Sequence, residues 1–320
     1  TAVAGDYTVE IKNQATPHCV SLTATGTVTV NPLPLATISG SIPSNSKVCI
    51  NDFATITFTG SLGTAGYTFE YNINGGTTQS VTTSGTTSTI TVNTGTAGIK
   101  TINLLSVTDA SLTACKETLT GISYTIEVLP LPILTITNPA PICAGDTVNL
   151  ETAIIPFDSG LTYTYWTNIG ASFPFSTSNA ATEGTYYIKA TNSTGCSSIA
   201  EVVVTEVALP TVSVNNALMC EGDSPTTITA TPSITGSYNF NWTVPSGVPN
   251  PGNVASFTTS VAGSYDVYIT DTNAPYCESA TATGTVTVNP LPTATISGGT
   301  DVCINESILP IVTFTGVIGT

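Results

Sequence analysis

Hydrophobic and polar residues alternate in short stretches along most of the chain. The alternation is clearest at residues 25–30, 67–73, 199–207 and 265–269. Successive side chains of a β-strand point to opposite faces of its sheet, so a period of two predicts strands that bury one face. Glycine, asparagine, serine and proline separate the stretches, as they do at turns, and no segment keeps a helical period. The pattern therefore predicts an all-β protein built from many short strands.

One stretch of the sequence recurs almost unchanged. Residues 25–40 read TGTVTVNPLPLATISG and residues 283–298 read TGTVTVNPLPTATISG, so the chain repeats itself after 258 residues. Long-range repetition of this kind is typical of array proteins, in which each unit buries its own core and contacts chiefly its neighbours.

Proline-rich joints divide this long period into three shorter units. The joints lie at residues 31–34, 129–132, 208–210 and 289–292. A Pro-x-Pro joint fixes backbone angles and removes amide donors, so it ends one strand and makes a stiff connection to the next unit. Each complete unit has the size of one small domain. The predicted division is into residues 1–34, 35–132, 133–210, 211–292 and 293–320, of which the first and last are incomplete domains. We expect the domains to lie end to end, and we expect the chain to be part of a longer protein.

Aromatic residues sharpen the predicted fold of these units. Each complete unit carries an aromatic cluster, at residues 67–71, 163–166 and 238–242, where the immunoglobulin plan places its core aromatic on the third strand. Trp166 and Trp242 are therefore predicted to be core residues. Together with the short strands, the clusters predict a tandem array of immunoglobulin-like β-sandwich domains.

A second aromatic signal lies further along the units. Tyr7, Tyr186 and Tyr265 each open an alternating strand two residues after a glycine. That is the position of the tyrosine corner, whose hydroxyl bonds back to the chain a few residues upstream. The unit at 35–132 has Lys100 in this place and departs from the pattern.

The charge of the chain excludes one class of partner. Five lysines stand against twenty acidic residues, arginine is absent, and the formal net charge is −15. A phosphate backbone demands clustered basic residues, so we expect no nucleic acid partner. No apolar run is long enough to span a bilayer, so we expect no membrane insertion in this segment.

The joints and the cysteine motifs resemble those of a known class of repeat. The NPLP-TATISG joint, the Cys-x-Gly-Asp sequences at 143–146 and 220–223, and the Gly-x-Tyr strands that lead to a second cysteine resemble PKD-like and Ig-like repeats. Such repeats occur in giant surface proteins that the type 9 secretion system of Bacteroidota exports, including SprB-type gliding-motility adhesins. The resemblance implies an extracellular filament or stalk. It also makes Thr147, within Asp146-Thr147-Val148, a candidate for O-glycosylation. The alternative, that Thr147 is an unmodified threonine of a turn, is equally open.

Eight cysteines follow the repeat. An early cysteine precedes the second strand of each unit, and a late cysteine follows the Gly-x-Tyr strand. The early cysteines are Cys49, Cys143, Cys220 and Cys303, and the late cysteines are Cys19, Cys115, Cys196 and Cys277. This regularity predicts a disulfide framework formed outside the cytoplasm. A zinc site is disfavoured because no C-x-x-C pair or histidine accompanies the widely spaced cysteines.

The sequence leaves two disulfide pairings open. The favoured pairing staples each unit to itself, as Cys49–Cys115, Cys143–Cys196 and Cys220–Cys277, and leaves Cys19 and Cys303 to pair elsewhere. The alternative joins neighbouring units, as Cys49–Cys196 and Cys143–Cys277. It is based on the immunoglobulin plan, which puts the early and late cysteines of one domain at opposite ends, whereas bonded Cα atoms must lie within about 7 Å.

Candidate catalytic and metal-binding residues have weaker support. His18 is the only histidine, and a tyrosine replaces it in the copy at residues 273–277, so no catalytic triad is predicted and we expect no enzyme. An acidic residue recurs three positions after each early cysteine, where it is expected to bond to its own turn. The sharper hypothesis for this position is a calcium ligand, although no dense acidic loop supplies the six or more oxygens that calcium prefers. The residues concerned are Asp52, Asp146, Asp223 and Glu306.

Two functions remain open. The favoured one is a structural stalk of an extracellular adhesin or filament, whose partners are other parts or copies of the same surface protein. The alternative is a set of modules that bind a surface polysaccharide through exposed aromatic residues. The scarcity of lysine and the core-like spacing of the aromatics favour the stalk.

Overall fold

Strands make up almost all of the regular structure. The computed structural model describes residues 3–42, 46–299, 301, 304, 311–317 and 319. Within those ranges the helical segments are two short 3-10 turns, η1 (Leu150–Ala153) and η2 (Ser178–Ala180), and neither could cross a membrane. The predicted all-β class is therefore confirmed.

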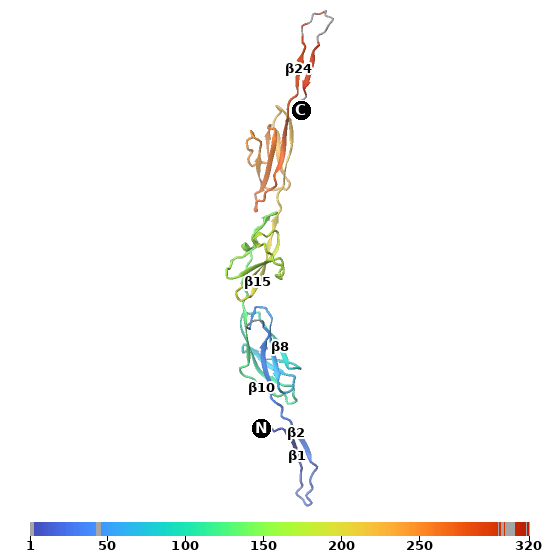
Figure 1. Cartoon of the computed structure of the whole chain (residues 1–320), viewed down its shortest axis with the longest axis vertical. Helices are drawn as coiled ribbons and strands as arrows, with labels where there is room; N and C mark the ends of the chain where they lie inside the picture. The colour runs from blue at the N-terminus through green and yellow to red at the C-terminus, as the bar shows by residue number, and fades with distance from the viewer. Residues whose placement is uncertain are drawn as a thin grey trace. The chain divides into compact units, whose positions relative to one another are not determined.

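The repeat at 35–132 folds into two facing sheets (Figure 1, where β8 and β10 are labelled). The first sheet has the order β3-β5-β8, with β3 (Leu35–Gly40), β5 (Ala54–Ser61) and β8 (Thr87–Val92). The second has the order β4-β11-β9-β6-β7, with β10 beside β9. Its strands are β4 (Lys47–Cys49), β11 (Ser123–Leu129), β9 (Gly98–Thr108), β6 (Thr68–Ile73), β7 (Gln79–Thr82) and β10 (Lys116–Thr118). The start of the repeat thus divides between the sheets, because β3 pairs antiparallel with β5 while β4 pairs parallel with β11.

The core of this repeat lies between the two sheets. Strand β5 buries every second residue, as its alternating sequence predicts, and Ile56 and Phe58 are fully buried. Phe58 stacks on Phe69 of the opposite sheet with ring centroids 5.6 Å apart. Burial of such side chains contributes about 1.5–3 kcal/mol each and is the main term that holds the sheets together.

The repeat at 211–292 has the same plan. One sheet has the order β17-β19-β21, with β17 (Val212–Val214), β19 (Thr226–Pro232) and β21 (Ser256–Thr259). The other has the order β18-β23-β22-β20, with β18 (Ala217–Cys220), β23 (Ala282–Asn289), β22 (Gly263–Asp271) and β20 (Tyr238–Thr243). Again the first two strands of the repeat belong to different sheets, because β17 pairs with β19 while β18 pairs parallel with the last strand, β23. The immunoglobulin-like sandwich inferred from the sequence is the observed fold.

The repeat at 133–210 has fewer regular strands. Its elements are β12 (Ile142–Cys143), β13 (Thr162–Trp166), β14 (Gly184–Thr191), β15 (Ser197–Val204) and β16 (Glu206–Val207). They form the sheets β13-β14-β15 and β12-β16, and single bridges such as Val148 to Ala181 replace the ladders of a second sheet. Leu150 of η1, Ile188 and Val202 are fully buried.

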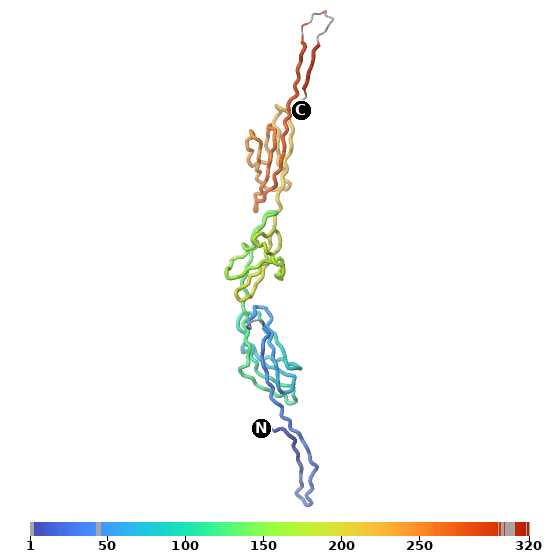
Figure 2. The backbone as a smooth tube through the Cα atoms, in the orientation of Figure 1, coloured from blue at the N-terminus to red at the C-terminus, as the bar shows by residue number. Residues whose placement is uncertain are grey.

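A two-stranded hairpin lies near each end of the sequence (Figure 2, blue and red). The first pairs β1 (Gly5–Val9) with β2 (Ala24–Val28), and the second pairs β24 (Thr293–Ser297) with β25 (Thr313–Val317). All residues of these four strands are exposed.

The chain forms two compact units. The first comprises Thr1–Ile133, Asp158–Tyr163 and Ala190–Ser198, and the second comprises Leu134–Phe157, Thr164–Lys189 and Ile199–Thr320. The segment at 190–198 therefore packs with the first unit, although the sequence assigns it to the repeat at 133–210. The predicted division into five domains stays a prediction.

The aromatic predictions are confirmed in large part. The hydroxyls of Tyr7, Tyr186 and Tyr265 each donate to the carbonyl four residues upstream, at 2.9, 3.2 and 2.8 Å, so the tyrosine corner is present in three repeats. Trp242 is 6% exposed and belongs to the core. Trp166 differs, because it is only partly buried and its ring nitrogen donates to Thr164 on its own strand.

Candidate functional site: cysteine turns at the repeat joints

Each early cysteine that the structure describes within a complete repeat begins a tight turn. In these early turns, at residues 49–52, 143–146 and 220–223, the amide of the acidic residue donates to the carbonyl of the cysteine, at 3.1, 2.9 and 3.1 Å. The third residue has positive φ in all three turns, and glycine occupies it in two of them. The carboxylates of Asp52 and Asp223 also accept from the cysteine amide of their own turn, at 3.3 and 2.8 Å. These two acidic residues therefore have the turn-stabilising role that the sequence favoured.

Strand pairing places each early turn beside a joint. Cys49 is paired with Leu129, the last residue of β11, and Ile50 donates to the carbonyl of Leu129. Cys220 is paired in the same way with Asn289, the last residue of β23. The parallel pairing of the early strand with the last strand thus brings the cysteine to the point where the repeat ends.

The late cysteines close turns of a second kind. In these late turns, which span residues 13–19, 109–115, 192–196 and 271–277, the amide of the first residue donates to the carbonyl of the cysteine at 2.9–3.0 Å. The first residue is Asp or Asn, and its side chain accepts from the cysteine amide in two of the turns, at 2.9 Å for Asp109 and 3.0 Å for Asn192. In these two turns the same residue therefore sets the turn and orients its cysteine.

Two of the late turns also contact the joint that precedes their own repeat. Asn192 donates to the carbonyl of Pro130 at 3.3 Å, and Ser198 donates to the carbonyl of Pro132 at 2.7 Å. In the preceding repeat, Asn31 of the first joint donates to Thr113 of the late turn at 3.0 Å. Because the early turn lies beside the same joint, the joint brings an early turn and a late turn together.

Two disulfides form where these turns meet. Cys49 bonds to Cys196 with Cα atoms 5.6 Å apart, and Cys143 bonds to Cys277 with Cα atoms 5.5 Å apart. Each bond lies within one of the two compact units, yet each links an early turn to the late turn of the next repeat along the sequence. The favoured pairing within repeats, which joined Cys49 to Cys115, Cys143 to Cys196 and Cys220 to Cys277, is wrong, and the alternative is correct.

The physical reason for this correction is the length of strand β9. Its first residue, Gly98, pairs with Val128 beside the early turn, whereas its last residue, Thr108, pairs with Lys116 beside the late turn. Eleven residues of strand span roughly 33 Å at about 3.3 Å per residue. Two cysteines at opposite ends of such a strand cannot bond, since a disulfide needs Cα atoms within about 7 Å.

Three cysteines of the described residues are free thiols. Cys19 and Cys220 are exposed and Cys115 is partly buried. Cys303 lies outside the described residues. The prediction that Cys115 and Cys220 are bonded is therefore wrong for this chain.

Charged groups reinforce the late turn of the first complete repeat. The Asp109 carboxylate is buried and accepts from the amide of Thr64 at 3.0 Å, from the Ser111 hydroxyl and from the Cys115 amide. These hydrogen bonds, led by that of Thr64, lower the pKa of Asp109, although burial opposes them. Nearby, hydrogen bonds from Lys116, at 2.7 Å, and from Ser106 lower the pKa of Glu70.

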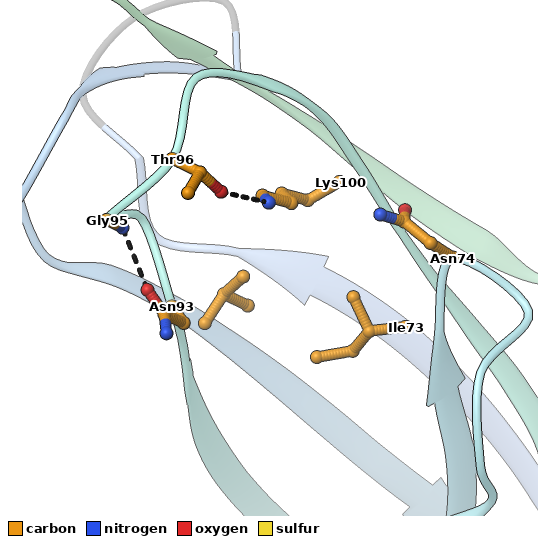
Figure 3. A pocket seen from close by; sticks show the side chains of 7 residues that line it. Ile73, Asn74, Asn93, Gly95, Thr96 and Lys100 are labelled. Carbon is orange, nitrogen blue, oxygen red and sulfur yellow. Dashed lines mark hydrogen bonds between the residues drawn. The ribbon is translucent and has the colours of Figure 1, made fainter.

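A pocket of about 400 Å³ lies next to an early turn (Figure 3). It is lined by residues of the loop after β8, which the early turn touches through a hydrogen bond from Asn51 to Thr94. The polar groups of its walls bond to each other, as Lys100 does to Thr96 and Gly95 to Asn93. Lys100, Thr96 and Asn93 of the lining are thus already engaged in hydrogen bonds within the wall.

The remaining candidate residues take these positions. His18 is exposed in a late turn, with Nδ1 3.3 Å from the carbonyl of Asn13. Thr147 is exposed directly after an early turn, and Glu306 lies outside the described residues. Among the described residues, no three His, Cys, Asp or Glu side chains gather in a way that could hold a metal ion.

Sequence reasoning found the cysteines but missed the contacts that place them. Asn192 and Ser198 bond to the joint at 129–132, and Asn31 bonds from the joint at 31–34 to a late turn. The sequence pattern gave no reason to predict these three hydrogen bonds. A usable signal was present for the late turns, because Asp or Asn begins each of the four.

Comparison with known proteins adds little to this description. No family model matches the chain, and none of the curated proteins is significantly similar to it. Among solved structures, the I-band fragment I67-I69 from titin is 14% identical, with a TM-score of 0.34, over 81% of this chain and 99% of that one. A solved chain from a structure of a 1.5-MDa bacterial ice-binding adhesin is 15% identical, with a TM-score of 0.29, over 81% of this chain and all of the solved chain. The four N-terminal Ig domains of a Dscam1 isoform are 15% identical, with a TM-score of 0.22, over 89% and 80% of the two chains.

Proposed function

We propose that this chain is a structural repeat segment, or stalk, of a large extracellular surface adhesin or filament. The observation that carries the proposal is the pair of disulfides that link consecutive repeats instead of stapling each repeat to itself. A bond within one small domain stabilises that domain alone. A bond from one repeat to the next also resists separation of the two, which is a useful property in a segment under tension.

Two further observations support an extracellular location. Disulfides form and persist in oxidising surroundings and are rare in cytosolic proteins. A net charge of −15 makes neighbouring copies repel one another, which suits a protein displayed at high density. The resemblance of the joints and early turns favours a type 9-secreted surface protein of Bacteroidota, with gliding motility as its setting and Thr147 as a glycosylation site.

The alternative, binding of a polysaccharide by the repeats, finds less support. Four of the nine aromatic side chains of the recurrent clusters are buried in the sandwiches, Phe69 and Trp242 among them, and the other five are partly buried. A sugar platform would therefore need other side chains. We also propose that the segment has no enzymatic activity and needs no cofactor, calcium included.

The proposal is tested by measuring separately how the chain changes rupture distance and how it changes binding strength. The chain is inserted between a bead anchor and a tip module of known ligand, and rupture distance and binding strength are compared with those of the tip alone. We expect a longer rupture distance and unchanged affinity, together with no retention of the chain alone by surface polysaccharides in affinity electrophoresis. Retention would favour the alternative. Antibodies against residues 1–320 should label intact source cells, and labelling only after lysis would contradict the location.

A further inference from the structure

The free thiol of Cys220 lies in a complete copy of the bonded early turns. Its amide donates to Asp223, whose own amide donates back to the Cys220 carbonyl, as in the turn of Cys49. Its pairing with Asn289 repeats the pairing of Cys49 with Leu129. Cys220 therefore occupies, beside the joint at 289–292, the place that Cys49 occupies beside the joint at 129–132.

The thiol of Cys115 lies in a complete copy of the bonded late turns. Its amide donates to Asp109 as that of the bonded Cys196 donates to Asn192. The turn already contacts the joint at 31–34 through Asn31 and Thr113, as the turn of Cys196 contacts the joint at 129–132. Cys115 thus lies at a joint whose early turn would belong to a preceding repeat.

The hairpin after the joint at 289–292 matches the opening of a complete repeat. Strands β24 and β25 pair Ile296 with Phe314, the register in which β3 and β5 pair Ile38 with Phe58. The hairpin is thus the start of another repeat. In the two bonded cases, a repeat in that position supplies the late cysteine.

We propose that Cys220 and Cys115 are complementary halves of a third inter-repeat disulfide. Cys220 bonds to the late-turn cysteine of an immunoglobulin-like repeat that comes after the joint at 289–292, and Cys115 bonds to the early-turn cysteine of a repeat that precedes the joint at 31–34. The partner of each thiol is therefore a cysteine in a further repeat of the same kind as those in this chain. The inference rests on the two bonded joints and does not depend on the function as a stalk.

Formation of the bond is an oxidation by a small disulfide such as oxidised glutathione. One thiolate attacks glutathione disulfide and releases one glutathione, and the second thiolate then displaces the other. The two cysteines lose two electrons and two protons, and the oxidant becomes two molecules of reduced glutathione.

A fusion in register provides the test. TFTG occurs at residues 57–60 and again at 313–316, so Thr320 corresponds to Thr64. Residues 1–320 are therefore joined directly to residues 65–320 of a second copy, which completes the repeat that begins at residue 293. Cys115→Ser in the first copy and Cys220→Ser in the second leave Cys220 of the first copy and Cys115 of the second as the two thiols under test.

The fused protein is oxidised with glutathione disulfide, alkylated and digested with pepsin at acidic pH, where disulfides do not exchange. We expect a peptide that links Cys220 of the first copy to Cys115 of the second. Adding Cys220→Ser in the first copy should make Cys115 of the second copy fully alkylated. A flexible linker between two whole copies, which leaves the repeat that begins at residue 293 incomplete, should leave both thiols alkylated.

Alkylation of both thiols in the fusion in register, in a digest that contains the Cys143–Cys277 peptide, would overturn the proposal. The single chain provides an independent check if the fusion folds badly. In it, Cys115 and Cys220 should both react with iodoacetamide, whereas a bond between these two cysteines within one chain would also overturn the proposal.

Discussion

At the scale of single residues, the late turns show two side chains doing the same work. Asp109 and Asn192 both accept the amide of the cysteine that ends their turn, so the oxygen, and not the charge, is what the turn requires. Asp109 has an added partner in the Thr64 amide, which ties the turn to the loop between β5 and β6. This extra bond explains why a carboxylate is used there.

Asp109→Asn should flatten the acid dependence of stability. A carboxyl with a lowered pKa stabilises the fold at pH values above its unfolded pKa, and this contribution is lost as the pH falls through the folded value. The original chain should therefore lose stability below about pH 4, whereas the variant should start lower at pH 7 and lose less. Urea unfolding between pH 7 and pH 2 measures both curves, with the exposed Glu183→Gln as control. Parallel curves for the variant and the original chain would contradict this role.

Trp242→Ala should destabilise its repeat by about 3–5 kcal/mol. The side chain is buried, its ring nitrogen donates to Val254 at 2.8 Å, and its ring meets Phe257 edge to face at 5.0 Å. Denaturant unfolding of the oxidised chain checks the loss, and the exposed His18→Ala should cause none. An unchanged transition together with lost polysaccharide binding would instead mark Trp242 as a surface platform.

At the scale of elements, the placement of the first two strands of a repeat in different sheets decides which cysteines can form a disulfide. Strands β4 and β18 follow a strand of the first sheet but pair with the last strand of the second sheet. This pairing places their cysteines at the end of the repeat. The late cysteines lie at the opposite end, beyond β9 and β22. A disulfide between these turns must therefore cross a joint.

Cys143→Ser should lower the stability of the oxidised chain, while Cys220→Ser should not. Cys143 closes a loop of 134 residues to Cys277, and loss of such a bond costs about 2–4 kcal/mol because the unfolded chain gains entropy. Cys220 is a free thiol in a turn of the same geometry, which makes its variant a matched control. Differential scanning calorimetry under oxidising conditions compares the two. Equal losses for both variants would support the pairing within repeats.

At the scale of the whole molecule, the two disulfides interlock. Cys143 lies inside the loop from Cys49 to Cys196, and Cys196 lies inside the loop from Cys143 to Cys277. A fully unfolded chain under tension would therefore be held at both loops at once.

Reduction should lengthen the stretched chain by roughly 600 Å, at about 3.5 Å per residue. With both bonds intact, the shortest covalent path from Cys49 to Cys277 runs through the residues between Cys143 and Cys196, about 53 of them. After reduction it includes all of the residues in between, about 228. Single-molecule force spectroscopy with and without reductant measures the gain. Cys220→Ser should leave it unchanged, and a shorter gain in that variant would contradict the interlocked pairing.

The oxidised chain should also be elongated in solution. Stiff joints and repeats that each have their own core favour an end-to-end arrangement over a folded-back one. Small-angle scattering gives the radius of gyration, and a value near that of a globular protein of the same length would refute the arrangement.

The sequence by itself determined the fold class, the repeats and the places of their turns. Alternation along strands such as β5 reports directly which face is buried, and the recurrent joints and cysteines report the period, because these signals are local. The tertiary structure decided the disulfide partners and the burial of particular aromatics. Whether Cys49 meets Cys115 or Cys196 depends on the length of β9 and on the pairing of β4 with β11, which joins residues far apart in the chain. Trp166 is likewise only partly buried because the repeat at 133–210 builds fewer regular strands around it.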